Sequence, residues 1–218
     1  MTSLTKTDRT TMTRLPERAS YDRETANAIL DEGLVAHVGF DVGQGTTVIP
    51  MTYARDGDCL YLHGAVASRW LSSFKEGRDV CISVTLLDGL VLARSAFSHS
   101  MNYRSVVAFG TATIVESDEK DRAFKALVDH LLPGRWEDCK QPDEKESAAT
   151  IVLKVPIDEA SIKTRSGDPG DSEKDMHIDD HWTGVIPLAR EAGVPIPDPT
   201  MKGDRDVPDY IASYRRGK

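Results

Sequence analysis

The residues best suited to chemistry lie at 99–105, where a polar cluster runs directly into an apolar stretch. The cluster reads His99-Ser100-Met101-Asn102-Tyr103-Arg104-Ser105, and an apolar run of β type follows it. A purely structural strand has no need of Asn, Tyr, Arg and Ser together at its entrance. A site for a planar, phosphorylated ligand does, because Tyr offers a ring face, Arg a rigid fork of donors and Ser a small hydroxyl. His99 alone is more often a hydrogen-bonded structural residue than a ligand or a base.

A second polar cluster lies upstream and contains His63, Gly64, Ala65, Ser68 and Arg69. Here a strand is expected to end, glycine permits close backbone approach, and Ser68 can cap a short helix. Free N–H groups at a helix start attract anions, and Arg69 would add charge-assisted donors. An ordinary strand–turn–helix with a capping serine explains the same residues and, taken alone, is the commoner case. Together, two clusters at predicted strand ends indicate one anionic cofactor held from two sides.

Three further groups are weaker candidates. Lys163 and Arg165 stand at a predicted strand end, where cations also commonly guard an exposed edge. His177 and His181 are four positions apart, but no third ligand accompanies them, so we predict no metal site. Trp182 begins an apolar island in a polar tail; it could cover an aromatic ligand, or it could dock on the barrel or on a partner.

The composition indicates a folded protein with one large domain or a core domain with extensions. The chain has 218 residues, of which 39% are hydrophobic and 28% charged, and its net charge is −8. This acidic balance argues against a nucleic-acid partner, which would need a basic surface. The three cysteines are scattered and form no C-x-x-C pair, so neither a disulfide framework nor a zinc ribbon has support. The polar N-terminus has no signal-peptide core and no apolar run reaches membrane-spanning length, so we expect a cytoplasmic protein.

The elements that would position these residues are mainly strands. A helix is expected from the N-cap at 22 to 33, a short one after 68 and an amphipathic one over 119–132. Strands are expected over 34–40, 46–54, 59–63, 80–86, 103–115, 151–155 and 161–164. Hairpin turns without regular βαβ alternation predict a mainly β, antiparallel barrel with attached helices. Residues 1–21 are expected to be an irregular leader, 22–188 the barrel domain and 189–218 a C-terminal arm.

These motifs resemble the pyridoxamine 5'-phosphate oxidase-related flavin-binding proteins, and within them the branch that contains the nitroimidazole-resistance proteins. The likeness rests on residues 61–69, 88–107 with Gly110, 129–135, 163–167 and 182–188, and it spans residues 14–190. The stretch 88–107 is the most specific part. The resemblance implies an FMN-binding split β-barrel of antiparallel Greek-key type with short flanking helices. It also implies a homodimer with FMN in two clefts at the subunit interface.

The resemblance assigns cofactor contacts to individual residues. The residues expected to bind FMN are Val48, Ile49, Pro50, Met51, His63, Gly64, Ala65, Ser68, Arg69, Asn102, Tyr103, Arg104, Ser105, Lys163, Arg165 and Trp182. By position, 68–69 match the phosphate-binding pair, 48–51 the strand whose backbone lies along the isoalloxazine, and 104–105 the polar pair near the ring. Residues 163, 165 and 182 match segments that approach the site from this subunit or the other one. Trp70 departs from the pattern, because oxidases acting on pyridoxamine phosphate carry a Lys there.

Three functions remain open on this reasoning. The first is an FMN-dependent oxidoreductase acting on a small molecule, in the manner of pyridoxamine-phosphate oxidases or nitroreductases, with the flavin supplying the redox chemistry. The second is a flavin-binding module for storage, sensing or regulation without turnover. The third keeps the barrel but holds a deazaflavin or a haem. The substrate-phosphate residues of the true oxidases find no match, which disfavours vitamin B6 oxidation.

Overall fold

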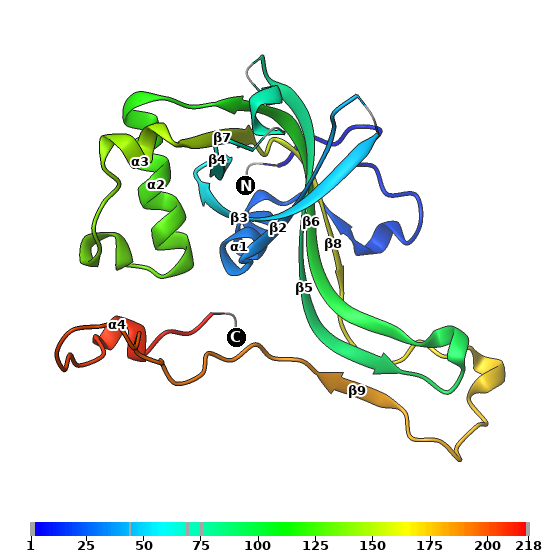
Figure 1. Ribbon diagram of the computed structural model, residues 1–218. Helices are drawn as coiled ribbons and strands as arrows, with labels where there is room; N and C mark the ends of the chain where they lie inside the picture. Colours follow the sequence, from blue (N-terminus) through cyan, green and yellow to red (C-terminus); the bar gives the residue numbers. More distant parts are fainter. Residues whose placement is uncertain (1–2, 44, 69, 75, 217–218) are drawn as a thin grey trace.

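The computed structural model describes residues 3–43, 45–68, 70–74 and 76–216, which fold around one antiparallel sheet (Figure 1). The strands are β1 (Ala19–Ser20), β2 (Val35–Asp41), β3 (Thr46–Asp56), β4 (Cys59–Ala65), β5 (Arg78–Leu92), β6 (Ser100–Ile114), β7 (Thr150–Pro156), β8 (Glu159–Arg165) and β9 (Gly184–Pro187). The α-helices are α1 (Arg23–Glu32), α2 (Ser117–Leu131), α3 (Glu144–Ala148) and α4 (Asp209–Ala212). The 3-10 turns are η1 (Pro16–Arg18), η2 (Leu71–Phe74), η3 (Ala96–Ser98), η4 (Arg135–Asp138) and η5 (Glu173–Asp175).

The sheet closes on itself into a barrel. Its strand order is β1-β8-β6-β7-β4-β3-β2-β5-β9, and β6 pairs with β5 as well. The strands β6, β7, β4, β3, β2 and β5 therefore form a closed ring, which β8 and β1 extend on one side and β9 on the other. The prediction of a mainly β, antiparallel barrel with a few helices is confirmed.

Alternating apolar residues fill this barrel. On β2, Ala36, Val38 and Phe40 point inward and are at most 3% exposed, as the period of two predicts. The helix α1 closes one end of the barrel with its buried Ile29 and Leu30. The predicted N-cap forms, because the Asp22 carboxylate accepts a hydrogen bond of 2.8 Å from the Thr25 N–H. A second apolar cluster lies between the sheet and α2.

The β5–β6 hairpin is longer than the sequence predicts. Each strand has 15 residues, and the pair extends beyond the barrel to a tip at η3 (Figure 1). The predicted end of β5 at residue 86 is wrong, because a register shift between Leu87 and Gly89 keeps the strand paired with β6 past the Asp-Gly step. The predicted start of β6 at Tyr103 is wrong for the same reason. The polar cluster at 100–105 consequently lies inside a paired strand and not at its entrance.

Other elements differ in extent from the prediction. The helix expected after Ser68 is only the four-residue turn η2. The apolar island near 182–188 forms β9, which pairs with residues 89–92 of β5. The strand expected over 161–164 is β8, and it is therefore the last strand but one.

The segments before and after the barrel pack against it. Near the N-terminus, Leu4 is 4% exposed, Arg9 Nε donates a 2.7 Å hydrogen bond to Glu159, and β1 pairs with β8. Beyond β9, the chain runs past α4, and Arg216 donates hydrogen bonds to backbone carbonyls at the end of α1. Within the described residues, no helix has both the length and the apolar character needed to cross a membrane.

Candidate functional site

The strands β3 and β4 separate partway along their length and leave a fork, which is the first candidate ligand site. Residues 53–56 of β3 pair with β4, whereas residues 46–52 pair only with β2 in the described part of the chain. Backbone groups on the other edge of residues 46–52 are therefore available to a ligand. Ile49 and Met51 pack against the core, while Val48 (58% exposed) and Pro50 face outward. Because Pro50 has no N–H, donors on this edge come from its neighbours.

The end of β4 forms the other arm of the fork. His63, Gly64 and Ala65 pair with β7 but not with β3. A Cβ on Gly64 would stand 2.5 Å from Leu71 Cδ1, so the close return of η2 against the strand requires glycine. The Ser68 N–H donates to the Ala65 carbonyl at 2.9 Å, which fixes the tight turn between them. Surrounding atoms desolvate the His63 imidazole and lower its pKa, although the residue as a whole is exposed.

The proposed phosphate-binding pair is described only in part. Arg69 lies outside the described residues. Trp70, where related oxidases carry Lys, stacks on Phe40 with ring centroids 5.2 Å apart and meets Phe74 edge-on. Its side chain therefore belongs to an aromatic cluster. Because η2 is a single 3-10 turn, any phosphate held here depends on local N–H groups and side chains more than on a helix dipole.

The residues on β6 and β8 form a second, separate cluster. Arg165 donates to the Asn102 side-chain oxygen and to two backbone carbonyls of the turn that follows β8. Tyr103 lies opposite Arg165 in the ladder, and Ser105 lies opposite Lys163 and donates a 3.1 Å hydrogen bond to its carbonyl. These contacts fix the Arg165 guanidinium in place.

Arg104 joins two carboxylates within the chain. Its Nε and Nη2 donate to Asp88 at 2.9 and 2.7 Å, and its Nη2 also donates to Glu32 at 2.8 Å. These hydrogen bonds and charges raise the pKa of the guanidinium further above its ordinary value. Its donors are thus engaged in a bridge between the end of α1 and the register shift of β5. Sequence reasoning missed this role because Glu32 lies 72 positions away.

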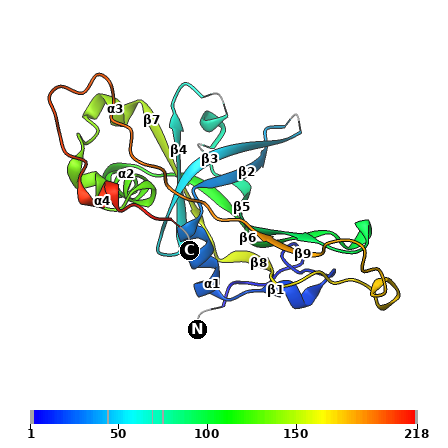
Figure 2. The same cartoon turned by 90° about the horizontal axis from the view of Figure 1, so that it is seen from below.

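The two predicted ligand-binding clusters do not come together within one chain. The fork and η2 lie at one end of the molecule, and the tip of the β5–β6 hairpin lies at the other (Figures 1 and 2). Trp182 belongs to the hairpin end, precedes β9 and is 68% exposed, so it covers no part of the fork. One cofactor held by both clusters would need a second copy of the chain.

In the described part of the chain, a face of the sheet with no helix residue in its lining lies beside the fork. It holds a shallow hollow of about 430 Å³ whose lining includes His37, Gly39, Val48, Cys81 and Phe109. We call this the open sheet face. Sequence reasoning missed it, although the outward alternation of His37 and Gly39 on β2 was the available signal. Within the described residues, no group of three or more His, Cys, Asp or Glu side chains could hold a metal ion.

The chain matches the family model described as pyridoxamine 5'-phosphate oxidase over residues 22–164. Comparison with the curated proteins gave no match. Among solved structures, the flavocytochrome Anf3 from Azotobacter vinelandii is 40% identical, with 97% of this chain and 98% of that chain covered and a TM-score of 0.90.

Two further solved structures extend the comparison. The FAD and haem binding protein from Mycobacterium smegmatis is 35% identical, with 89% of this chain and 95% of that chain covered and a TM-score of 0.84. A protein from Bacteroides thetaiotaomicron assigned to 5-nitroimidazole antibiotic resistance is 25% identical, with 66% and 85% covered and a TM-score of 0.55. The flavocytochrome match therefore includes most of the leader and most of the segment after β8, which the family model leaves out.

Proposed function

The chain belongs to the pyridoxamine 5'-phosphate oxidase family, a family of flavin-binding split barrels, and from this premise we propose that it is a redox protein carrying a flavin and a haem. The observation that carries this proposal is the match to the flavocytochrome along 97% of the chain. A likeness to the shared barrel alone would have ended near residue 164. The sequence alone left open a haem in place of the flavin, whereas this proposal combines a haem with the flavin and is favoured over a flavin-only oxidoreductase.

The fork between β3 and β4 fits a flavin. Its open strand edge offers backbone donors and acceptors to the edge of a planar ring, and Gly64 lets η2 return close to the end of β4 beside it. Ser68 follows at the turn where a phosphate would lie. A bound flavin supplies hydride and single-electron chemistry, so the protein has to bind the ring, orient it and leave one face accessible.

We propose FAD as the flavin, where the sequence alone predicted FMN. Support comes from the FAD and haem binding protein of M. smegmatis, which covers 89% of this chain. Trp70 in place of a phosphate-binding Lys also fits a flavin whose binding relies less on a terminal phosphate. Release of the cofactor by mild acid, followed by chromatography against FAD, FMN and riboflavin standards, decides between them.

We further propose that two copies pair through the open sheet face. Its hollow is mostly apolar and Val48 is 58% exposed, while Arg9 of the leader lies over the Phe109 ring, 4.6 Å from its centroid. Such pairing would also let the hairpin of one copy approach the fork of the other. Symmetric dimers are the commonest soluble oligomers.

Charge placed on the open sheet face tests the dimer. Cys81→Glu should give a monomer by light scattering, whereas Cys139→Glu, which alters another free and partly exposed cysteine, should leave the dimer intact. A dimer that survives Cys81→Glu would refute this interface.

We also propose that the protein is cytoplasmic. The function itself is tested by anaerobic reduction of the purified protein. A reduced nicotinamide should reduce the bound flavin first and the haem afterwards. Stopped-flow absorption at the flavin and Soret bands monitors the two steps. Reduction of neither cofactor by any nicotinamide or flavin donor would favour a binding module without turnover.

A further inference from the structure

A second hollow, at the outer end of the β5–β6 hairpin, is lined by basic side chains. It has a volume of about 280 Å³ and lies between the leader, η3 and the end of β8. We call it the hairpin hollow. Its lining residues are Arg14, Arg18, Phe97, Ser98, His99, Ser100, Arg165 and Gly170. None of these residues carries a carboxylate, which sets the hollow apart in a chain of net charge −8.

Two of its arginines have no partner among the described residues. The side chains of Arg14 and Arg18 form neither an ion pair nor a hydrogen bond there. The arginines that do form ion pairs in the structure are Arg9, Arg23, Arg55, Arg94, Arg104, Arg122 and Arg135. Arg165 adds a third positive charge, and its hydrogen bonds hold it in place. Unpaired guanidinium forks beside a fixed one are suited to a ligand with more than one carboxylate.

His99 is oriented as a metal-ligating histidine would be. Its Nδ1 lies 3.0 Å from the Ser95 carbonyl oxygen, and because a carbonyl only accepts, the proton must sit on Nδ1. The Nε2 lone pair is then free for a ligand bond. A backbone carbonyl fixing the other ring nitrogen is the usual arrangement for histidines that bind metals. His130, by contrast, has its Nε2 engaged by the Gly33 carbonyl and by Arg216.

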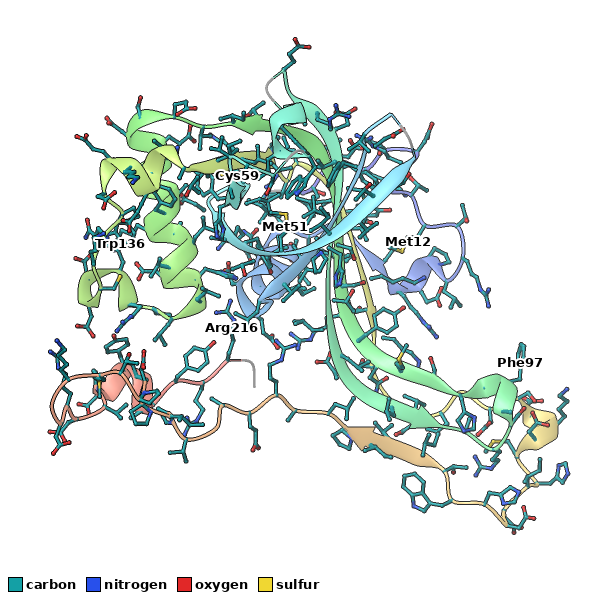
Figure 3. All side chains as sticks on the ribbon, viewed as in Figure 1. Met12, Met51, Cys59, Phe97, Trp136 and Arg216 are labelled. Atoms are coloured by element: carbon teal, nitrogen blue, oxygen red, sulfur yellow. The ribbon has the colours of Figure 1, made fainter. Side chains whose placement is uncertain are left out.

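Apolar surface stands beside these polar groups. Phe97 is 95% exposed and projects from the hairpin tip (Figure 3). Met101, two positions beyond His99, is 49% exposed. A large aromatic side chain left in water next to three arginines is suited to a ligand with a broad apolar face and an anionic edge.

Four of the eight residues that line the hairpin hollow lie outside the family match, two before it and two after it. Arg14 and Arg18 precede residue 22, where the match begins, and Arg165 and Gly170 follow residue 164, where it ends. The match to the flavocytochrome covers 97% of the chain and so takes in most of these flanking segments. The arginines of the hollow therefore come from segments outside the family match, whereas residues 97–100, with His99, come from the shared barrel.

We propose that the hairpin hollow is the haem site, in which His99 Nε2 would bind the iron and Arg14 and Arg18 would pair with the two propionates. This inference rests on the proposed function, which requires a haem. Phe97 would offer apolar contact to the macrocycle, and Arg165 would supply a fixed positive charge. The donor set fits, since a neutral imidazole binds haem iron and arginine pairs with carboxylates.

The iron ligand is tested by titrating the flavin-loaded protein with haemin and recording the Soret band. His99→Ala should lose or shift this band, and added imidazole should restore it, whereas His177→Ala, the matched control, should leave it unchanged. Both histidines are exposed, so flavin content and the unfolding temperature should stay at their wild-type values. If the wild type binds haem and His99→Ala binds it with the same spectrum and affinity, this inference is overturned and the proposed function stands. If the wild type binds no haem, both fail.

The propionate contacts are tested separately. Arg14→Ala and Arg18→Ala should each weaken haem binding roughly tenfold without moving the Soret maximum, because each removes one charge-assisted contact. Arg205→Ala, on the exposed arm, is the control and should bind as the wild type does. With haem dimethyl ester, whose carboxylates are masked, the arginine variants should bind as the wild type does. Unchanged haem affinity together with weakened binding of ADP in these variants would identify a nucleotide site and overturn the proposal.

Discussion

Replacing Arg104 by glutamine should lower the stability of the fold while leaving the flavin affinity nearly unchanged. The side chain joins Glu32 and Asp88, and the three side chains are 25–35% exposed. Fully exposed ion pairs contribute roughly 0.2–1 kcal/mol each, whereas breaking a buried pair costs roughly 3–5 kcal/mol. With two partly exposed pairs lost, we expect a loss of about 2 kcal/mol. For a domain of this size that corresponds to a drop of about 4–8 °C in the unfolding temperature.

The assay is urea unfolding of the flavin-free protein, with flavin titration in parallel. Arg122→Gln, whose side chain is 61% exposed and also bridges two carboxylates, is the control and should cost far less. At 1 M salt, where the Debye length is about 3 Å, the deficit of Arg104→Gln should shrink. In a background that also carries Glu32→Gln and Asp88→Asn, Arg104→Gln should have little further effect. Unchanged stability together with a large loss of flavin affinity would refute the structural role and restore the ring contact implied by the family resemblance.

Three further outcomes follow from single contacts. Arg216→Ala removes charge-assisted hydrogen bonds to the Asp31 and Gly33 carbonyls, so a protease should cleave the C-terminal arm roughly tenfold faster than in the wild type. The neighbouring Arg215→Ala should leave the cleavage rate unchanged. Gly64→Val should raise the flavin Kd roughly tenfold or more by pushing η2 away from β4. Gly193→Ala, at a position with open space around it, should leave flavin binding unchanged. Equal Kd values for the wild type and Gly64→Val would show that flavin binding does not depend on the close packing of η2 against β4. Hydrogen bonds from Arg9 and Thr7 lower the pKa of Glu159 from 4.5 to about 2. The ionised Glu159 carboxylate therefore contributes its full stabilisation at pH values above 4.5, and this stabilisation disappears as the pH falls toward 2. Urea midpoints of the wild type and Glu159→Gln should therefore differ at pH 7 and converge near pH 2, and a constant gap would contradict this assignment.

The barrel could be predicted from the sequence because its signals are local. The alternation of Ala36, Val38 and Phe40 fixes which face of β2 is buried, and the Asp22 side chain caps α1 within three residues. The length of the β5–β6 hairpin could not be predicted in this way. An Asp-Gly step usually marks a turn, but here pairing on both sides by β6 and β9 carries the strand through it.

For the candidate sites too, the sequence predicted residues close to one another in the chain and missed contacts between distant segments. The resemblance singled out the fork through residues 48–51 and 63–68, which are close in sequence to the turns that form it. It could not show that Arg104 is engaged by Glu32, because that contact joins segments 72 positions apart. Nor could it show that Arg14 and Arg165 line the same hollow, since only the folding of the leader onto β8 brings them together.

The central claim, that this chain carries a flavin and a haem together, is tested most directly by one absorption spectrum. The protein should be expressed with haem supply, purified and scanned before and after reduction with dithionite. The account predicts flavin bands and a Soret band that remain in constant proportion through size-exclusion chromatography, with sharpened α and β bands on reduction. A protein that retains flavin but no haem, even after haemin is added, would contradict the account and return the chain to the flavin-only oxidoreductases.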